Sequence, residues 1–242
     1  MVKNTDLNSK QIRMAADTLK QLNREIIQCN KCKRLTNFRV KISNNKRKEY
    51  INEDYWAKPI TGFGDINAEI LIVGLAPAAH GGTRTGRVFT GDKSSDFLYK
   101  CLYEAKMTNQ EHSISKNDGL ELYNTYITTA LKCVPPNDRP TSEELNECSK
   151  YFKRELECIK NSIYIVALGK IAFDAIIKYY SLNISKFSKR PKFKHGEFFD
   201  LPDNKKLVAC YHPSPRNVNT GRINKIKMVN LLRKVKKELD KR

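Results

Sequence analysis

Four of the seven cysteines stand at positions that suit one metal centre. Cys29 and Cys32 form a C-x2-C pair, Cys133 follows an apolar run, and Cys148 comes fifteen residues later. Two residues between thiolates suit two corners of one site, and four thiolates suit either zinc or an iron–sulfur cluster. The long gap between the two pairs means that the fold has to close the site. The alternative is that the C-x2-C pair consists of two unrelated cysteines.

The other three cysteines are predicted to be buried structural thiols. Cys101, Cys158 and Cys210 lie within apolar patterns that are typical of core positions. An odd number of cysteines in a chain without an export signal argues against a disulfide framework.

A glycine-rich stretch and a histidine motif are the other candidates for chemistry. The stretch Gly74–Asp92 reads GLAPAAHGGTRTGRVFTGD, and its glycines allow the backbone to approach a ligand closely. Backbone N–H groups there could hold a base edge or a phosphate, although the spacing is not that of a P-loop. The motif HPSPRNVNTGR begins at His212, at the end of an apolar run. A lone histidine is more often structural, but this position and the basic residues after it make a functional role as well supported as a structural one.

Positive charge indicates a polyanionic partner. The chain carries 45 Lys and Arg against 26 Asp and Glu, a formal net charge of +19. Eight basic residues and no acidic one lie in Lys31–Lys48, and ten lie in the tail Arg216–Arg242. Nucleic acid explains this clustering better than a generally basic surface does.

Apolar runs alternate with helical patterns, which predicts an α/β fold. We expect a three-layer α/β/α sandwich with a central four-stranded parallel sheet, because the runs are apolar throughout and separated by helices. The expected strands are Ile70–Gly74, Tyr126–Leu131, Ile163–Gly169 and Lys206–Tyr211. Ligands in such sheets bind at the carboxyl ends of the strands, where loops begin at Gly74, Cys133 and His212.

The chain is predicted to form a single domain over residues 1–242. An amphipathic helix is expected at Ser9–Gln28, with Ile12 on its apolar face, and a basic helix closes the chain. No stretch approaches the roughly 18 apolar residues of a membrane span, and the N-terminus lacks the apolar core of a secretory signal. We therefore expect a soluble cytoplasmic protein, without membrane contact, that acts as a monomer.

Taken together, the motifs resemble the family-5 uracil-DNA glycosylases, which are the iron–sulfur type of the uracil-DNA glycosylase superfamily. The resemblance extends from Cys29 to Arg222. It rests on the glycine-rich stretch, the histidine motif, the four cysteines, the Lys132–Pro136 segment and the Trp56–Asp65 loop. It implies a DNA-repair enzyme that hydrolyses the N-glycosidic bond of uracil, and also of hypoxanthine and xanthine, and leaves an abasic site. It further implies that Cys29, Cys32, Cys133 and Cys148 bind a structural [4Fe–4S] cluster.

The resemblance also assigns roles within the motifs. Phe89 is expected to stack on a flipped base and His212 to donate a hydrogen bond to it, whereas Asp92 would orient water or stabilise the sugar cation. A loop-capping Asp92 is the alternative. Substrate contacts are expected from Leu75, Ala76, His80, Phe89, Asn137 and Asp138, and DNA contacts from Arg84, Arg87, Ser214, Arg216 and Arg222.

Departures from related glycosylases leave base specificity open. Thr129 stands where a neighbouring family has Asn, and Asp138 stands where family-5 members often have Asn, with Asn137 just before it. The turn Ala76–Ala79 lacks the carboxylate that other families use to activate water. A non-enzymatic, metal-containing nucleic-acid-binding protein is the rival interpretation, because charge and cysteines alone would look the same.

Overall fold

The centre of the protein is a mixed six-stranded sheet. The structure is a computed structural model that describes residues 2–241, with side chains from residue 13 onward. Strand order is β1-β3-β2-β4-β6-β5. The strands are β1 (Phe63–Gly64), β2 (Ile70–Gly74), β3 (Thr125–Thr129), β4 (Tyr164–Leu168), β5 (Phe198–Asp200) and β6 (Lys206–Cys210).

The expected α/β class is confirmed, and the sheet has six strands where a central sheet of four parallel strands was predicted. Pairing is parallel from β3 through β2 and β4 to β6, whereas β1 and β5 add antiparallel edges. These edge strands are only two and three residues long. Such short segments carry no alternating or continuous apolar pattern, and for that reason the sequence did not reveal them.

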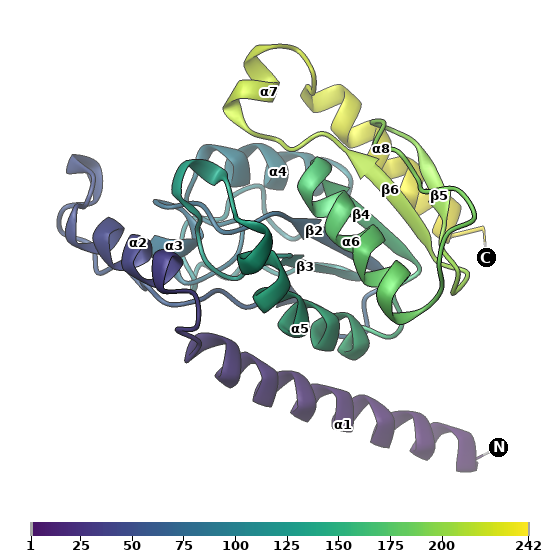
Figure 1. Cartoon of the computed structure of the whole chain (residues 1–242). Coiled ribbons are helices and arrows are strands. Elements are labelled where there is room, and N and C mark those ends of the chain that lie inside the picture. Colours follow the sequence, from purple (N-terminus) through teal and green to yellow (C-terminus); the bar gives the residue numbers. More distant parts are fainter. Residues whose placement is uncertain (1, 242) are drawn as a thin grey trace.

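Helices cover both faces of the sheet, so that the molecule has three layers (Figure 1). The first core cluster joins one sheet face to α1, α5 and α6, and the second joins the other face to α4 and α8. The helices are α1 (Val2–Ile27), α2 (Lys33–Asn44), α3 (Gly82–Thr85), α4 (Lys93–Glu104), α5 (Ser142–Cys158), α6 (Lys170–Asn183), α7 (Pro215–Asn219) and α8 (Lys225–Leu239), with 3-10 turns η1 (Lys48–Tyr50) and η2 (Pro136–Asp138).

Alternation along the strands explains their composition. Leu71 and Val73 of β2 belong to the first core cluster, whereas Ile70 and Ile72 belong to the second. Because both faces are covered, both sets of side chains are apolar, as is usual for parallel sheets between helices.

The expected N-terminal helix is present as α1 and packs along α5. Leu22 and Ile26 of α1 are fully buried in the first core cluster, which also contains residues of α5. Arg154 of α5 forms an ion pair with Glu25. Ile12, which the pattern placed on the same face, lies outside the residues whose side chains are described. None of the helices in the described part combines the length and the apolar character needed to cross a membrane.

Register brings the carboxyl ends of the parallel strands to one edge. Gly74 pairs with Thr129 across β2 and β3, and Leu168 pairs with Cys210 across β4 and β6. The chain segments that follow these residues therefore emerge side by side. They carry the glycine-rich stretch, the Lys132–Pro136 segment and the histidine motif, as expected for a ligand site in such a sheet.

Candidate active site and cysteine centre

Phe89 and His212 form the centre of the site at the carboxyl edge. Their ring centroids lie 6.0 Å apart with the ring planes tilted by 33°. Phe89 has φ of 46°, a left-handed conformation that is strained for a bulky side chain and that recurs at functional sites. The sequence analysis expected these two side chains to act on one base, although they lie 123 residues apart in the chain. The fold does bring them together.

The strand ends have small residues because the Phe89 and His212 side chains lie against their backbone. A Cβ at Gly74 would stand 2.7 Å from the Phe89 ring, closer than real Cβ contacts. The methyl group of Thr129 lies 3.5 Å from the same point, so β3 contributes to this wall. A Cβ at Gly169, directly after β4, would meet the Cβ of His212 at 3.3 Å.

His212 is held as a neutral imidazole. Its backbone carbonyl accepts a hydrogen bond of 2.9 Å from the Asn217 side-chain amide. Burial lowers the pKa of His212 to about 4, because the charged form would lose its hydration. A neutral imidazole offers one N–H donor and one acceptor nitrogen at physiological pH. Asn217 had no role in the sequence prediction, although its place inside the histidine motif was the available signal.

Asp92 begins α4 as its N-cap. Its Oδ1 accepts hydrogen bonds from the backbone N–H groups of Ser94 at 2.9 Å and Ser95 at 3.1 Å. The backbone N–H of Asp92 in turn donates to the Ser95 hydroxyl, which completes a capping box. Its Oδ2 lies against the loop, only 2.0 Å from where a Cβ at Gly81 would stand. Burial raises the pKa of Asp92, and the two backbone N–H groups oppose that rise. The capping alternative thus describes contacts that are present, and the catalytic role stays a prediction.

Arg84 is a buried side chain that stabilises the glycine-rich loop through hydrogen bonds to its backbone. Only 7% of it is exposed, and it pairs with Glu53 while donating to the carbonyl oxygens of His80 and Gly91. Its guanidinium also stacks 3.8 Å above the Tyr50 ring. These contacts tie the loop to the basic segment before it, and the expected DNA contact stays untested.

Arg87 has a similar internal role. It forms a two-point ion pair with Asp118, at 2.9 and 2.8 Å, and donates to the hydroxyls of Thr90 and Ser113. Because only 4% of Arg87 is exposed, these partners replace water around the charge. The pair lowers the pKa of Asp118 to about 2 against the desolvation that raises it. Arg87 thus fixes the backbone that carries Phe89, and its predicted DNA contact stays untested.

His80 contacts an aromatic group on the neighbouring loop. Its Nδ1 lies 2.8 Å from the Tyr55 hydroxyl, and its ring stacks near Tyr50. Burial and the charges of Arg47 and Arg84 lower the pKa of His80. These contacts place His80 beside the tyrosines, and the predicted substrate contact is not tested by them.

The remaining predicted contact residues lie around the same edge. Leu75 accepts a backbone hydrogen bond from Leu131, and Ala76 packs on the first core cluster. Asn137 and Asp138 are exposed in η2, each with φ of 55°, a conformation that Asn and Asp tolerate well. Their contact with a base stays a prediction.

The short helix α7 presents basic side chains next to the strand edge. Ser214 caps α7 by accepting from the Asn217 backbone N–H, and Arg216 in α7 and Arg222 just after it are exposed. Neither arginine belongs to an ion pair found among the described residues. Both are therefore free to meet phosphate groups.

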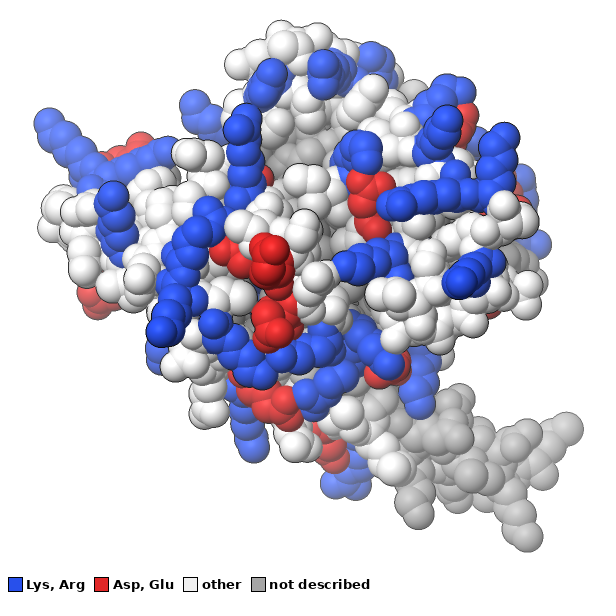
Figure 2. All heavy atoms as spheres, viewed as in Figure 1, with Lys and Arg blue, Asp and Glu red and all other residues white. Residues whose placement is uncertain are grey.

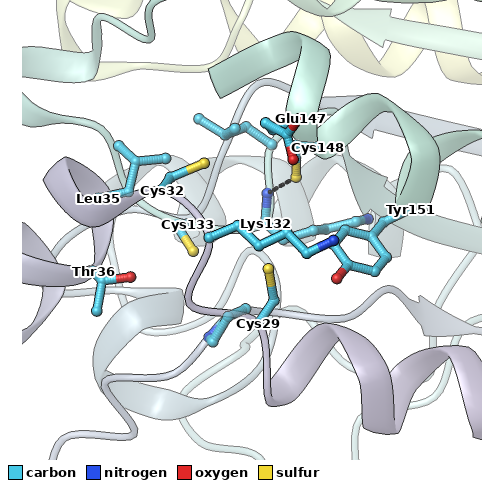
Figure 3. A pocket seen from close by; sticks show the side chains of 12 residues that line it. Cys29, Cys32, Leu35, Thr36, Lys132, Cys133, Glu147, Cys148 and Tyr151 are labelled. Atoms are coloured by element: carbon cyan, nitrogen blue, oxygen red, sulfur yellow. Dashed lines mark hydrogen bonds between the residues drawn. The ribbon is translucent and has the colours of Figure 1, made fainter. Parts of the chain in front are cut away.

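Four cysteines surround one small cavity, as Figure 3 shows. Cys29 follows α1, Cys32 caps α2, Cys133 follows β3, and Cys148 lies within α5. Burial raises the pKa of Cys133 to about 12 and that of Cys148 to about 11. No three His, Cys, Asp or Glu side chains in the described chain are arranged to hold a single metal ion.

Polar hydrogens point at these sulfur atoms. The backbone N–H of Lys132 donates to the sulfur of Cys148 at 3.2 Å, and Arg39 Nη1 lies 3.8 Å from the sulfur of Cys133. Arg39 is only 8% exposed, and its Nε has no hydrogen-bond partner among the side chains and backbone that the structure describes. Such donors favour thiolate over thiol.

A buried ion pair links the cysteine centre to the sheet. Lys132 Nζ lies 2.5 Å from Glu155 Oε2 and 2.7 Å from the Thr128 hydroxyl, and both charged side chains are at most 2% exposed. Glu155 also accepts the Gly62 backbone N–H at 3.1 Å. Sequence reasoning missed Glu155, although a carboxylate seven residues after Cys148 on the apolar face of α5 was the available signal.

The chain belongs to the uracil DNA glycosylase superfamily, whose family profile matches residues 61–238. Within it, the chain is 41% identical over 209 residues to the type-5 uracil-DNA glycosylase of Pyrobaculum aerophilum, covering 86% of this chain and 88% of that protein. Identity to the type-5 enzyme of Thermus thermophilus is also 41% over 209 residues, covering 86% and 93%. A type-4 enzyme of Archaeoglobus fulgidus is 32% identical over 202 residues, covering 82% of each chain. The resemblance predicted from the motifs is confirmed.

Replacing Lys132 by Met should destabilise the protein strongly, because Glu155 would keep a buried charge without its cation. We expect a loss of about 3–5 kcal/mol in the free energy of unfolding, measured by urea titration. The double variant Lys132→Met/Glu155→Leu removes both charges and should recover much of the loss. A single variant within about 0.5 kcal/mol of the wild type would contradict the structural role of the pair.

Proposed function

We propose that this protein hydrolyses the N-glycosidic bond of uracil in DNA, and of hypoxanthine and xanthine, and leaves an abasic site. The observation that carries the proposal is the Phe89–His212 pair at the carboxyl edge of the sheet. Relatives named type-5 uracil-DNA glycosylases, at 36–41% identity over most of the chain, support uracil as the substrate. The non-enzymatic alternative gives no reason for this pair or for the strained Phe89 backbone.

Glycosidic cleavage would leave an anionic base and an oxocarbenium-like sugar. The base must first leave the helix stack, which costs a few kcal/mol and favours mispaired bases. Phe89 would then offer its ring for stacking, and the neutral His212 would donate to the negative charge that develops on the base. A fixed donor of this kind contributes about 3–4 kcal/mol to catalysis.

Hydrolysis without strand cleavage is supported by the state of the buried lysine. The Lys132 ammonium is committed to Glu155 and Thr128, so it does not supply a free amine for a covalent intermediate with the sugar. Exposed Arg216 and Arg222 would hold phosphates beside the flipped nucleotide. Monomeric state and cytoplasmic location stay predictions.

We propose that Cys29, Cys32, Cys133 and Cys148 hold a [4Fe–4S] cluster. Their thiols surround one cavity, and four thiolates suit a cluster whose four irons take one thiolate each (Figure 3). Arg39, buried without a carboxylate partner beside Cys133, supplies a positive charge for the anionic group. The cluster would serve as a structural cross-link, since base hydrolysis needs no electron transfer.

Purified anaerobically, the protein should absorb near 400 nm, as iron–sulfur proteins do, and contain iron and sulfide. Cys148→Ser should lose most of both, because it removes one of four ligands, whereas Cys101→Ala should retain them as a matched buried cysteine outside the cavity. Metal analysis and absorption spectra make the comparison. Stoichiometric zinc without sulfide would contradict the cluster.

Replacing His212 by Ala should slow base excision by about 10²–10³-fold with little change in DNA binding, because the lost donor acts on charge that exists near the transition state. His212→Asn should recover part of the rate, since its amide also donates. Single-turnover rates at saturating enzyme report the chemical step alone.

The low pKa of His212 sets the pH range of that donor. The imidazole stays neutral well above its pKa of about 4, so its protonation should not reduce the rate between about pH 8 and pH 5. In the unfolded chain His212 gains this proton near its ordinary pKa of about 6.5, so the histidine's contribution to stability falls as the pH drops from 6.5 toward 4.

Wild-type single-turnover rates in His212→Ala would show that the histidine is structural.

Asp92→Asn should separate capping from chemistry. Asn caps helices about as well as Asp, so the free energy of unfolding should change by less than about 0.5 kcal/mol. Loss of the negative charge should nevertheless slow excision, and hypoxanthine should suffer more than uracil, because it depends more on how water and sugar are held. Unchanged single-turnover rates on both bases would leave Asp92 as a cap only.

A further inference from the structure

A second, larger cavity lies between α5 and α6, and its wall reaches the carboxyl edge of the sheet at Ala130, the residue after β3. Its volume is about 710 Å³, and it shares no lining residue with the cysteine cavity. Sites that bury most of a drug-sized ligand span about 300–1,000 Å³, so the cavity can receive more than one large side chain. Uracil excision, as proposed above, makes no use of it.

The walls of this cavity are apolar. They are formed by Leu145 and Phe152 of α5 and by Ile171, Tyr179 and Leu182 of α6. Ile171 is 38% exposed and Leu182 is 72% exposed, whereas Phe152 forms part of the buried core below. Large apolar side chains gathered in a concave surface mark a site that another molecule covers.

The rim of the cavity is basic. Lys150, Lys153, Lys178 and Arg190 line it against one carboxylate, Asp174. Figure 2 shows Lys and Arg side chains gathered over this face of the molecule, with acidic side chains among them.

The rim cations are available to a partner. Lys150 and Lys153 pair with exposed carboxylates of their own helix, Glu147 at 3.0 Å and Glu157 at 3.9 Å, and Lys150 also lies beside Lys31. Arg190 reaches Asp174 at 3.8 Å. Exposed pairs of this kind contribute little, so incoming carboxylates can compete for the cations.

We propose that the groove between α5 and α6 binds an acidic amphipathic helix of a partner protein. Two or more apolar side chains of that helix would enter between Ile171 and Leu182, and its carboxylates would meet Lys150, Lys153 and Lys178. Helices bind helical grooves in this way, with anchors spaced three and four residues apart. The apolar floor of the groove offers no hydrogen-bond donors to the phosphate groups of DNA. The basic rim and the apolar floor together therefore favour an acidic amphipathic peptide over DNA.

A fluorescein-labelled synthetic peptide tests the proposal, with Leu at i, i+4 and i+7 and Glu at most other positions. We expect it to bind the full-length protein in fluorescence anisotropy, and Leu182→Glu to weaken binding by about tenfold or more, as loss of an anchor contact does. Ile226→Glu on α8 is the matched control, because Ile226 is exposed to 71% and Leu182 to 72%. Both variants should excise uracil at the wild-type rate, so the outcome is independent of the proposed function.

Several outcomes would overturn the groove as a peptide site. A peptide with Ala in place of Leu that binds equally well would show attraction by charge alone. Equal weakening by Leu182→Glu and Ile226→Glu would place the peptide elsewhere. Loss of duplex DNA affinity in Leu182→Glu, with peptide binding unchanged, would assign the groove to nucleic acid. No binding by the wild-type protein at about 100 μM peptide, a weak affinity for such contacts, would also reject it.

Discussion

The parallel register of four strands is the constraint on which the site depends. Because Gly74, Thr129, Leu168 and Cys210 end their strands at one edge, segments far apart in the chain emerge next to each other. Phe89 reaches this edge from the loop after β2, and His212 reaches it directly after β6. A slip of one residue in the pairing would turn every side chain of a strand to the other face of the sheet, and it would separate Phe89 from His212.

The cysteine centre and the Phe89–His212 pair share the end of β3. The chain runs from Thr129, beside the Phe89 ring, through the buried Lys132 to Cys133 in four residues. Lys132 is anchored at both ends, because its backbone N–H donates to Cys148 and its ammonium pairs with Glu155. A group that cross-links the cysteines would therefore fix the same backbone that lies beside Phe89.

The sequence predicted those features whose signal is local. Strands covered on both faces are apolar throughout, and the C-x2-C pair and the long motifs are contiguous, so these features were found. The edge strands β1 and β5 were missed because they are too short for a pattern. Partners that lie 31 residues apart, such as Arg84 with Glu53 and Arg87 with Asp118, were beyond local reasoning. Both arginines were expected on DNA, whereas the fold buries them against these carboxylates.

Excision of uracil tests the central claim most directly. The protein, purified anaerobically, is incubated in excess with an end-labelled duplex that contains one uracil, and an identical duplex with thymine is the control. We expect alkali to break the strand at the uracil and nowhere else, and the strand to stay intact without alkali. An intact uracil strand after alkali would contradict glycosylase activity, and a break before alkali would contradict hydrolysis without strand cleavage.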